Sequence, residues 1–419
     1  MALKRRHSIV ALSFAAVLIC YLDRVSISVA VVPLQAELGL SATRTGTVLS
    51  AFFLGYVACQ IPAGWAAQRI GPRLLLAFAL LWWSLMTMLT PIAAHTSFAM
   101  LIAVRILMGV GEASMFPGAY ALFANWVPAA ERSRAVGLLF SAIPLGTLVA
   151  LSASGLIGAT LGWPWIFYIF GTIGIGFAML WLFAVTDVPT SRKDAGQEWR
   201  AAIRPRVPWR ALLSKVPVWA LIINSFCTSW SIYVILAWTP LYLREVQHVS
   251  LASAGLFASL PWITMFLMTN LAAWSADMLI ARGVDVTFVR KLMQVTGLSG
   301  AAIFLLAMPG ATSAMSAALL LCGALGSNAL TMSGFAPNHL DLTPRYASVL
   351  IGITNTAGTL PGIIGVFITG WMVDVTGNYD SAFYTAAIVS VCGAVVFLLF
   401  ASGRPLKDLE RPGKTLPGK

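Results

Sequence analysis

The sequence contains twelve long apolar segments, and these constrain the fold more than any other feature. Charged residues or Pro- and Gly-rich stretches separate each segment from the next. An α-helix rises ~1.5 Å per residue, so about 20 apolar residues cross the ~30 Å hydrocarbon core of a bilayer. The 419-residue chain is 59% hydrophobic and 10% charged, which excludes an ordinary water-soluble fold. We therefore predict an all-α polytopic membrane protein with transmembrane helices near residues 8–32, 46–68, 74–94, 97–123, 134–158, 164–186, 217–243, 251–280, 288–308, 313–338, 346–372 and 380–402.

A polar stretch after the sixth segment divides the chain into two halves. We expect a six-helix bundle over residues 1–186, a linker over 187–216 and a second six-helix bundle over 217–419. Two pairs of fragments indicate that the halves are related: GWAAQRIGPR with AAWSADMLIAR at an offset of 209, and NWVPAAERSRA with NHLDLTPRYAS at an offset of 213. A parallel repeat of six helices is typical of secondary transporters that move two bundles around a central site.

The basic residues predict the orientation. With both termini on the inner side, 23 of the 27 Lys and Arg residues fall in inner segments, and only Arg44 and Arg244 fall in outer loops. By the positive-inside rule both termini are cytoplasmic, and the expected location is the cell inner membrane. The net charge of +12 follows from this topology and indicates no nucleic-acid partner. The basic N-terminus followed by an apolar run resembles a signal peptide, but the run continues to a charged pair, which favours an uncleaved first helix.

Four charged residues lie in the middle of predicted helices, away from the ends: Asp23 and Arg24 in the first, and Arg105 and Glu112 in the fourth. A charged side chain at a helix centre costs about 2.5–3.5 kcal/mol unless it is paired or hydrated. Arg105 and Glu112 are seven residues apart and share one helix face, where Gly109 leaves room for a ligand or a neighbouring helix. Asp23 and Arg24 point ~100° apart, so each needs a partner on another helix.

Two interpretations of these charges remain open. They form either a static network that pins the first helix to the fourth, or an anion site with carboxyl groups that titrate. Two arginines and two carboxylates sum to zero, and protonation of one acid leaves the site positive. We therefore hypothesise that proton uptake on Asp23 or Glu112 frees Arg24 and Arg105 to bind an anion.

Five stretches of the sequence carry a family resemblance: YLDRVSISVA, FFLGYVACQIPAGW, VRILMGVGEA, PVWALIINSFCTSW and NHLDLTPRYASVLIGITNTAGTLPG. Together they resemble the anion:cation symporter family of the major facilitator superfamily. This family includes plastid phosphate transporters, vesicular glutamate and sialic acid transporters, and bacterial sugar-acid carriers. The resemblance implies a major facilitator fold, substrate contacts at Arg24 and Arg105, and proton coupling at Asp23 and Glu112.

Further candidates for substrate binding are polar residues in apolar surroundings. Tyr21 lies two residues before Asp23, and Tyr56 and Tyr233 match tyrosines that face the substrate in the family, although packing or interface anchoring explains a tyrosine equally well. Asn355 is suited either to a hydrogen bond with a polyhydroxy ligand or to a bridge between helices. Ser333 is the remaining candidate.

Four other charged residues are interpreted as gate or structural groups. Asp341 and Arg345 are four residues apart and suited to an ion pair on one helix. Asp277 and Arg282 belong to the second copy of the inner-loop motif, whose first copy has Gln68 where the family pattern has an acid.

The motifs also bear on the substrate. Leu49 and Thr228 occupy positions where the glutamate-carrying members have a histidine and a third arginine. Fewer cations favour a monoanion, such as a sugar acid or a similar monocarboxylate, with phosphate, a dicarboxylate or an amino-acid anion as the alternative. We expect a monomer in the lipid bilayer that uses a proton gradient, or sodium in its place, and no cofactor or metal.

Other classes of protein fit less well. A drug:proton antiporter has little need of two buried arginines, and the paired halves argue against a passive channel. An enzyme is not expected, because the sequence has no HExxH, nucleophile-elbow or P-loop motif.

Overall fold

The computed structural model describes residues 2–127, 132–187, 208–343 and 346–406. This part of the chain contains helices and no strands, and twelve of its spans are long and apolar enough to cross a membrane. The predicted all-α polytopic fold is thereby confirmed. The helices are α1 (Ala2–Leu38), α2 (Ala42–Arg69), α3 (Pro72–Thr96), α4 (Phe98–Glu112), α5 (Met115–Trp126), α6 (Arg132–Thr160), α7 (Trp163–Ala184), α9 (Trp209–Leu213), α10 (Val216–Glu245), α11 (Leu251–Ala281), α12 (Val286–Ala307), the short 3-10 helix η3 (Met308–Gly310), α13 (Ala314–Asn328), α14 (Thr331–Leu342), α15 (Ala347–Thr376) and α16 (Asp380–Phe400).

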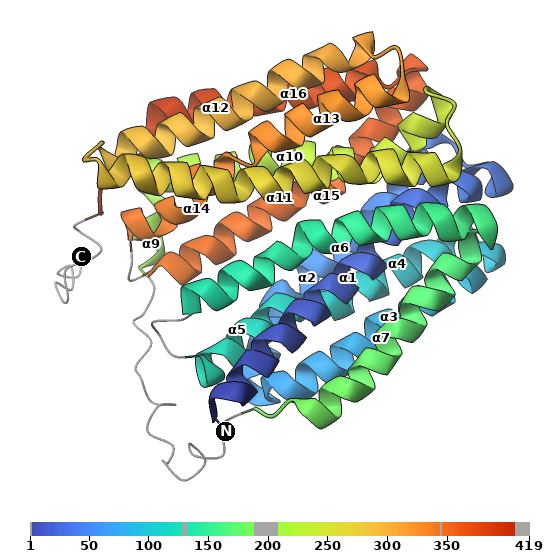
Figure 1. Cartoon of the computed structure of the whole chain (residues 1–419), viewed down its shortest axis with the longest axis horizontal. Coiled ribbons are helices and arrows are strands. Elements are labelled where there is room, and N and C mark those ends of the chain that lie inside the picture. Colours follow the sequence, from blue (N-terminus) through green and yellow to red (C-terminus); the bar gives the residue numbers. More distant parts are fainter. Residues whose placement is uncertain (1, 128–131, 188–207, 344–345, 407–419) are drawn as a thin grey trace.

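The helices form two bundles that lie side by side (Figure 1). In the first bundle α1 packs on α6, α3 on α7, and α4 on both α2 and α3. In the second bundle α10 packs on α15 and α16, and α12 packs on α13 and α16. The bundles meet where α2 packs on α15, α6 on α11, and α1 on α10. The described chain begins and ends on one side of the molecule, called the terminal face below, and the other side is called the opposite face (Figure 1).

One transmembrane span in each bundle is broken in the same way. Helices α4 and α13 each have 15 residues, and the helices that follow them, α5 and α14, each have 12. Both pairs begin after a serine, Ser97 or Ser313, whose side-chain oxygen accepts a hydrogen bond from the third residue of the helix. The two helix pairs therefore align in sequence with an offset of 216 residues. In this alignment Glu112, at the first break, corresponds to Asn328, at the second.

Several contacts join the bundles near the opposite face. Gly155 of α6 lies so close to Gly255 of α11 that a Cβ on the former would be 3.0 Å from the Cα of the latter. Asp374 of α15 accepts hydrogen bonds from the backbone N–H groups of Ala42 (2.9 Å) and Thr43 (2.7 Å) at the start of α2. A carboxylate at this position also stabilises the positive end of the α2 dipole. From this side α6 and α11 diverge toward the terminal face (Figure 1).

Candidate functional site

A buried ion pair connects α1 to the end of α4 at the centre of the first bundle. Arg24 Nε donates a hydrogen bond of 2.8 Å to Oε2 of Glu112, and Nη2 forms a salt bridge to the same oxygen at 2.7 Å. The two side chains are 4% and 0% exposed. The Cys20 thiol, one turn before Arg24, donates to the same oxygen at 3.1 Å. The other oxygen, Oε1, is buried without a hydrogen-bond partner. Because one carboxylate oxygen receives three donors, loss of the negative charge on Glu112 removes most of what holds Arg24 in this position.

Aromatic rings surround the Arg24 guanidinium. Its central carbon lies 4.7 Å from the ring centroids of Phe52 and Tyr56 and 4.8 Å from that of Tyr21. The Tyr21 hydroxyl also accepts a long hydrogen bond of 3.5 Å from Nη1. Desolvated contacts of this kind favour a cation, so the three rings stabilise the charged form of Arg24 in addition to its carboxylate partner.

Arg105 lies about two helical turns from this pair along α4, and it forms no ion pair with a carboxylate among the described residues. The side chain is buried, Nη1 contacts the Met108 sulfur at 3.1 Å, and Nε has no hydrogen-bond partner. The guanidinium carbon is 5.7 Å from the Phe52 ring, on which Arg24 also lies. A buried guanidinium with unused N–H groups can donate hydrogen bonds to a bound anion.

Glycines bring α2 close enough to α4 to hold these groups together. A Cβ on Gly109 would lie 2.0 Å from the Phe52 carbonyl oxygen, and one on Gly55 would lie 2.0 Å from the Ile106 carbonyl oxygen. The sequence suggested that Gly109 leaves room either for a ligand or for a neighbouring helix. In the structure a neighbouring helix, α2, occupies this space. This close approach places the Phe52 ring against both arginines.

A small central cavity separates the two bundles beside the arginines. Its volume is about 20 Å³, enough for a water molecule and too small for an organic anion. In this conformation, binding of a substrate requires the walls to move apart. The cavity is lined by Arg24, Val25, Ile27, Ser28, Leu49, Phe52, Phe53, Arg105, Tyr233, Leu236 and Ala237.

Asp23 faces away from this cavity, into the interior of the first bundle. Its carboxylate is fully buried, and neither oxygen has a hydrogen-bond partner of good geometry. Trp83 and Thr87 of α3 are among its polar neighbours. The predicted divergence of Asp23 and Arg24 is thus observed. Asp23 does not line the central cavity, so the four charged residues do not share one chamber in this conformation.

The structure places the other predicted substrate residues at two locations. Tyr21, Tyr56 and Tyr233 lie at the central site, where the first two contact Arg24 and the third lines the cavity and packs on Phe53. Asn355 is exposed on α15, and Ser333 is buried in α14, where its backbone carbonyl accepts a hydrogen bond from Arg290 at 3.1 Å. Neither Asn355 nor Ser333 lines the central cavity.

The predicted gate residues lie on the second bundle. Asp341 accepts a hydrogen bond of 2.8 Å from Nε of Arg290 on α12, a partner that the sequence did not suggest. Its expected partner, Arg345, lies outside the described residues. Asp277 and Arg282 are exposed at the end of α11 and after it, and neither forms an ion pair within the described ranges.

The second bundle contains a neutral polar network around the break between α13 and α14. The Gln294 amide donates to Asn224 Oδ1 and to Thr228 Oγ1 (3.1 Å), and Asn328 donates to the Thr228 carbonyl at 3.2 Å. All four side chains are buried. Asn328 occupies the position that corresponds to Glu112, so the two halves differ in charge at equivalent breaks. Sequence reasoning singled out only Thr228, because isolated amides in apolar helices give no sign of which others they contact.

Comparison with known proteins identifies the family. Residues 13–366 match the sequence model of the Major Facilitator Superfamily. The chain belongs to this superfamily. A solved structure of a bacterial homologue of the human lysosomal transporter Spinster has the same fold, with a TM-score of 0.78, 18% identity and coverage of 98% of this chain and 99% of that one.

Two curated relatives are named as transporters of ascorbate and of phosphate. The chain is 38% identical over 413 residues to the chloroplastic ascorbate transporter of Arabidopsis thaliana, covering 96% of this chain and 76% of that protein. It is also 38% identical over 413 residues to the chloroplastic sodium-dependent phosphate transport protein 1 of the same plant, covering 96% and 80%. The resemblance to the anion transporters of the superfamily is confirmed, and the chain is a multi-pass membrane transporter of anions rather than an enzyme.

Proposed function

We propose that this transporter couples protons to the symport of an organic monoanion, such as a sugar acid or a similar monocarboxylate, by alternating access. The observation that supports this most is the Arg24–Glu112 pair. The guanidinium fork that an anion needs is occupied by an internal carboxylate, which protonation neutralises. A substrate carboxylate and the Glu112 carboxylate therefore compete for the same cation.

The proposed cycle begins with a proton on Glu112. The neutral acid no longer balances Arg24, and the substrate carboxylate takes its place on Arg24 and reaches the unused N–H groups of Arg105. Each ligand makes binding of the other more favourable, which is the thermodynamic condition for symport. Asp23, buried behind Arg24 and unpaired, serves as the second proton site.

The character of the cavity supports a monoanion. Two arginines line it, and the positions of a further histidine and arginine in the glutamate carriers are Leu49, which lines the cavity, and Thr228, which lies in the neutral network. The ascorbate named for one relative is an organic anion, in agreement with this class.

Phosphate transport driven by sodium is the second candidate. The name of the other relative favours it, and a guanidinium fork suits phosphate as well as carboxylate.

The expected location is the cell inner membrane, with both termini cytoplasmic and the chain acting as a monomer.

Uptake into proteoliposomes tests the proposal. Gluconate, ascorbate, sialic acid, glutamate and phosphate are supplied in turn, with an imposed proton gradient or an imposed sodium gradient. We expect uptake of a hydroxy-monocarboxylate that follows the proton gradient and is lost in Arg24→Ala and Arg105→Ala. Uptake driven by sodium alone, or uptake of phosphate alone, contradicts the proposal.

The alternative of a purely structural network is tested by Glu112→Gln. If the Arg24–Glu112 pair only pins α1 to α4, this variant loses thermal stability but its remaining transport keeps the normal dependence on the proton gradient. If the pair couples the two fluxes, the variant binds anion while its transport no longer follows the gradient.

A further inference from the structure

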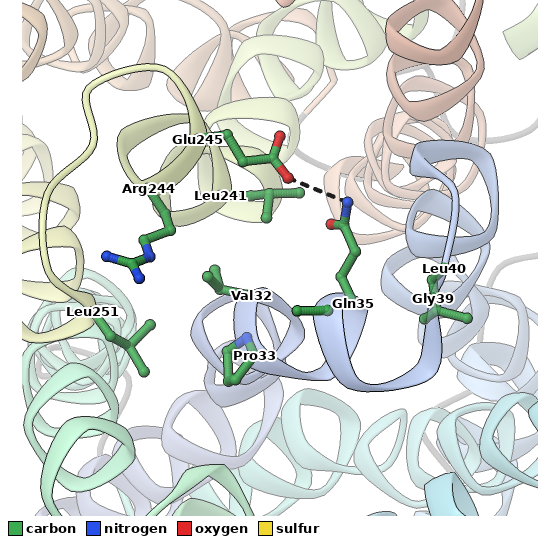
Figure 2. A pocket seen from close by; sticks show the side chains of 10 residues that line it. Val32, Pro33, Gln35, Gly39, Leu40, Leu241, Arg244, Glu245 and Leu251 are labelled. Atoms are coloured by element: carbon green, nitrogen blue, oxygen red, sulfur yellow. Dashed lines mark hydrogen bonds between the residues drawn. The ribbon is translucent and has the colours of Figure 1, made fainter.

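A second, larger cavity opens between the bundles at the opposite face. Its volume is about 430 Å³, within the range of small-molecule sites. Figure 2 shows its walls, formed by the last turns of α1 and α10 and the start of α11. The lining residues are Val32, Pro33, Gln35, Ala36, Gly39, Leu40, Leu241, Arg244, Glu245 and Leu251.

This outer cavity and the central cavity lie along the same seam between α1 and α10. On α1, Ser28 lines the central cavity and Val32 lines the outer one. On α10, Ala237 lines the central cavity and Leu241 lines the outer one. In each pair the residues are four apart, so they share a helix face and are separated by ~6 Å along the axis. About one helical turn of α1 and α10 thus separates the outer cavity from the arginine site.

The outer cavity offers a cation that no carboxylate neutralises. Arg244 donates from Nη1 to the Val249 carbonyl at 2.8 Å, and it has no ion pair in the described part of the chain. The adjacent Glu245 is turned elsewhere, because it accepts hydrogen bonds from Gln35 (3.2 Å) and from the Tyr379 hydroxyl (2.7 Å). Figure 2 shows Arg244 and Glu245 pointing in different directions around the cavity.

The cavity also has an unused acceptor. Gln35 donates its amide N–H to Glu245, and its carbonyl oxygen Oε1 is buried with no hydrogen-bond partner. A buried amide oxygen without a partner is costly, and a ligand hydroxyl satisfies it. Because the amide nitrogen keeps its bond to Glu245, such a ligand leaves this contact between the two bundles intact.

We propose that the outer cavity is a capture site for a hydroxylated organic monoanion, the class of substrate assigned above, and the inference rests on that proposed function. The substrate carboxylate binds Arg244, a hydroxyl donates to Gln35 Oε1, and the carbon skeleton packs on Val32, Leu241 and the other aliphatic side chains. From there the anion reaches Arg24 when the turn between the cavities opens.

The test is transport kinetics in proteoliposomes of known orientation, with gluconate and ascorbate as probes. Arg244→Gln removes the cation, and Arg44→Gln is the matched control. Arg44 is the other arginine near this face, where it stacks on Phe98 at 5.5 Å and does not line the cavity. We expect Arg244→Gln to raise KM for transport from the opposite face about tenfold, as for loss of one charge-assisted hydrogen bond. The kcat, and the KM from the terminal face, should stay within about twofold.

A second variant fills the site without touching a charge. Ala36 is exposed and lines the cavity, so Ala36→Trp should raise the KM from the opposite face as Arg244→Gln does, whereas Ala36→Ser should not. An unchanged KM in both Arg244→Gln and Ala36→Trp overturns the capture site, as does an equal rise in Arg44→Gln, which indicates general surface charge. Absence of organic-anion uptake by the unmodified protein instead overturns the proposed function on which the inference rests.

Discussion

Replacement of Glu112 by Gln should convert anion binding from pH-dependent to pH-independent. In the native site Oε2 accepts a hydrogen bond of 2.8 Å from Arg24 Nε and one of 3.1 Å from the Cys20 thiol, and it forms a salt bridge of 2.7 Å with Arg24 Nη2. Glutamine keeps the shape of the side chain and one acceptor oxygen but has no charge. A hydrogen bond to a charged group is worth about 1.5–3 kcal/mol. At alkaline pH, where the carboxylate competes for Arg24, the variant should bind the anion about 10- to 150-fold more tightly than the native protein.

The assay is calorimetric titration of purified protein with gluconate or ascorbate at acidic and alkaline pH. The native protein should bind more weakly at alkaline pH, and Glu112→Gln should bind equally well at both. Without ligand the variant should also melt at a lower temperature, because removal of one member of a buried pair costs about 3–5 kcal/mol. Saturating anion should restore much of that loss.

A matched control is Glu37→Gln. Glu37 is also on α1, where it accepts a hydrogen bond of 2.7 Å from the Trp163 indole, and it makes no contact with Arg24. This variant should keep the native pH dependence. Competition between the Glu112 carboxylate and the substrate is refuted if Glu112→Gln binds the anion more weakly than the native protein at alkaline pH. It is also refuted if binding by this variant has the same pH dependence as binding by the native protein.

Three further variants test other parts of the account. Arg24→Lys should reduce uptake at least tenfold while the fold remains, because lysine has no planar fork to make both bonds to one acceptor; near-native uptake in this variant contradicts that view. Gly109→Ala should lower stability by about 1–3 kcal/mol, since its Cβ would lie 2.0 Å from the Phe52 carbonyl oxygen, whereas Gly137→Ala, with open space around it, should not. Thermal melting compares these two glycine variants. Asp374→Asn should weaken closure at the opposite face by about 1 kcal/mol by removing a charge from the start of α2, which thiol labelling of cysteines introduced there should detect as greater exposure.

The fold was predictable from the sequence because lipid leaves the backbone few choices. A backbone that cannot bond to water forms helices, so the twelve apolar runs predicted the number of membrane spans and their helical type. The breaks after Glu112 and Asn328 were not predicted, since apolar residues continue through both.

The site was predictable in part. The cost of charge in lipid identified Arg24, Arg105, Asp23 and Glu112, and helical geometry required Asp23 and Arg24 to have different partners. It did not reveal which arginine Glu112 binds, because that depends on how α1 crosses α4. Cys20 lies four residues before Arg24 on the same helix face, and this spacing was the one available sign of its contact with Glu112.

Contacts between the two halves could not be predicted from the sequence. Gln35 and Glu245 are ordinary residues at helix ends, 210 positions apart, and become informative only when packing places them together. The same applies to Asp374, which caps a helix of the other bundle.

The central claim is that proton binding and anion binding favour each other through the Arg24–Glu112 pair. The most direct measurement is the number of protons taken up when the anion binds. Calorimetric titration in buffers of different ionisation enthalpy gives this number for purified protein. At a pH where Glu112 is ionised, the account predicts uptake of about one proton per anion by the native protein and none through this site in Glu112→Gln. Anion binding without proton uptake, or the same uptake in Glu112→Gln, contradicts the claim.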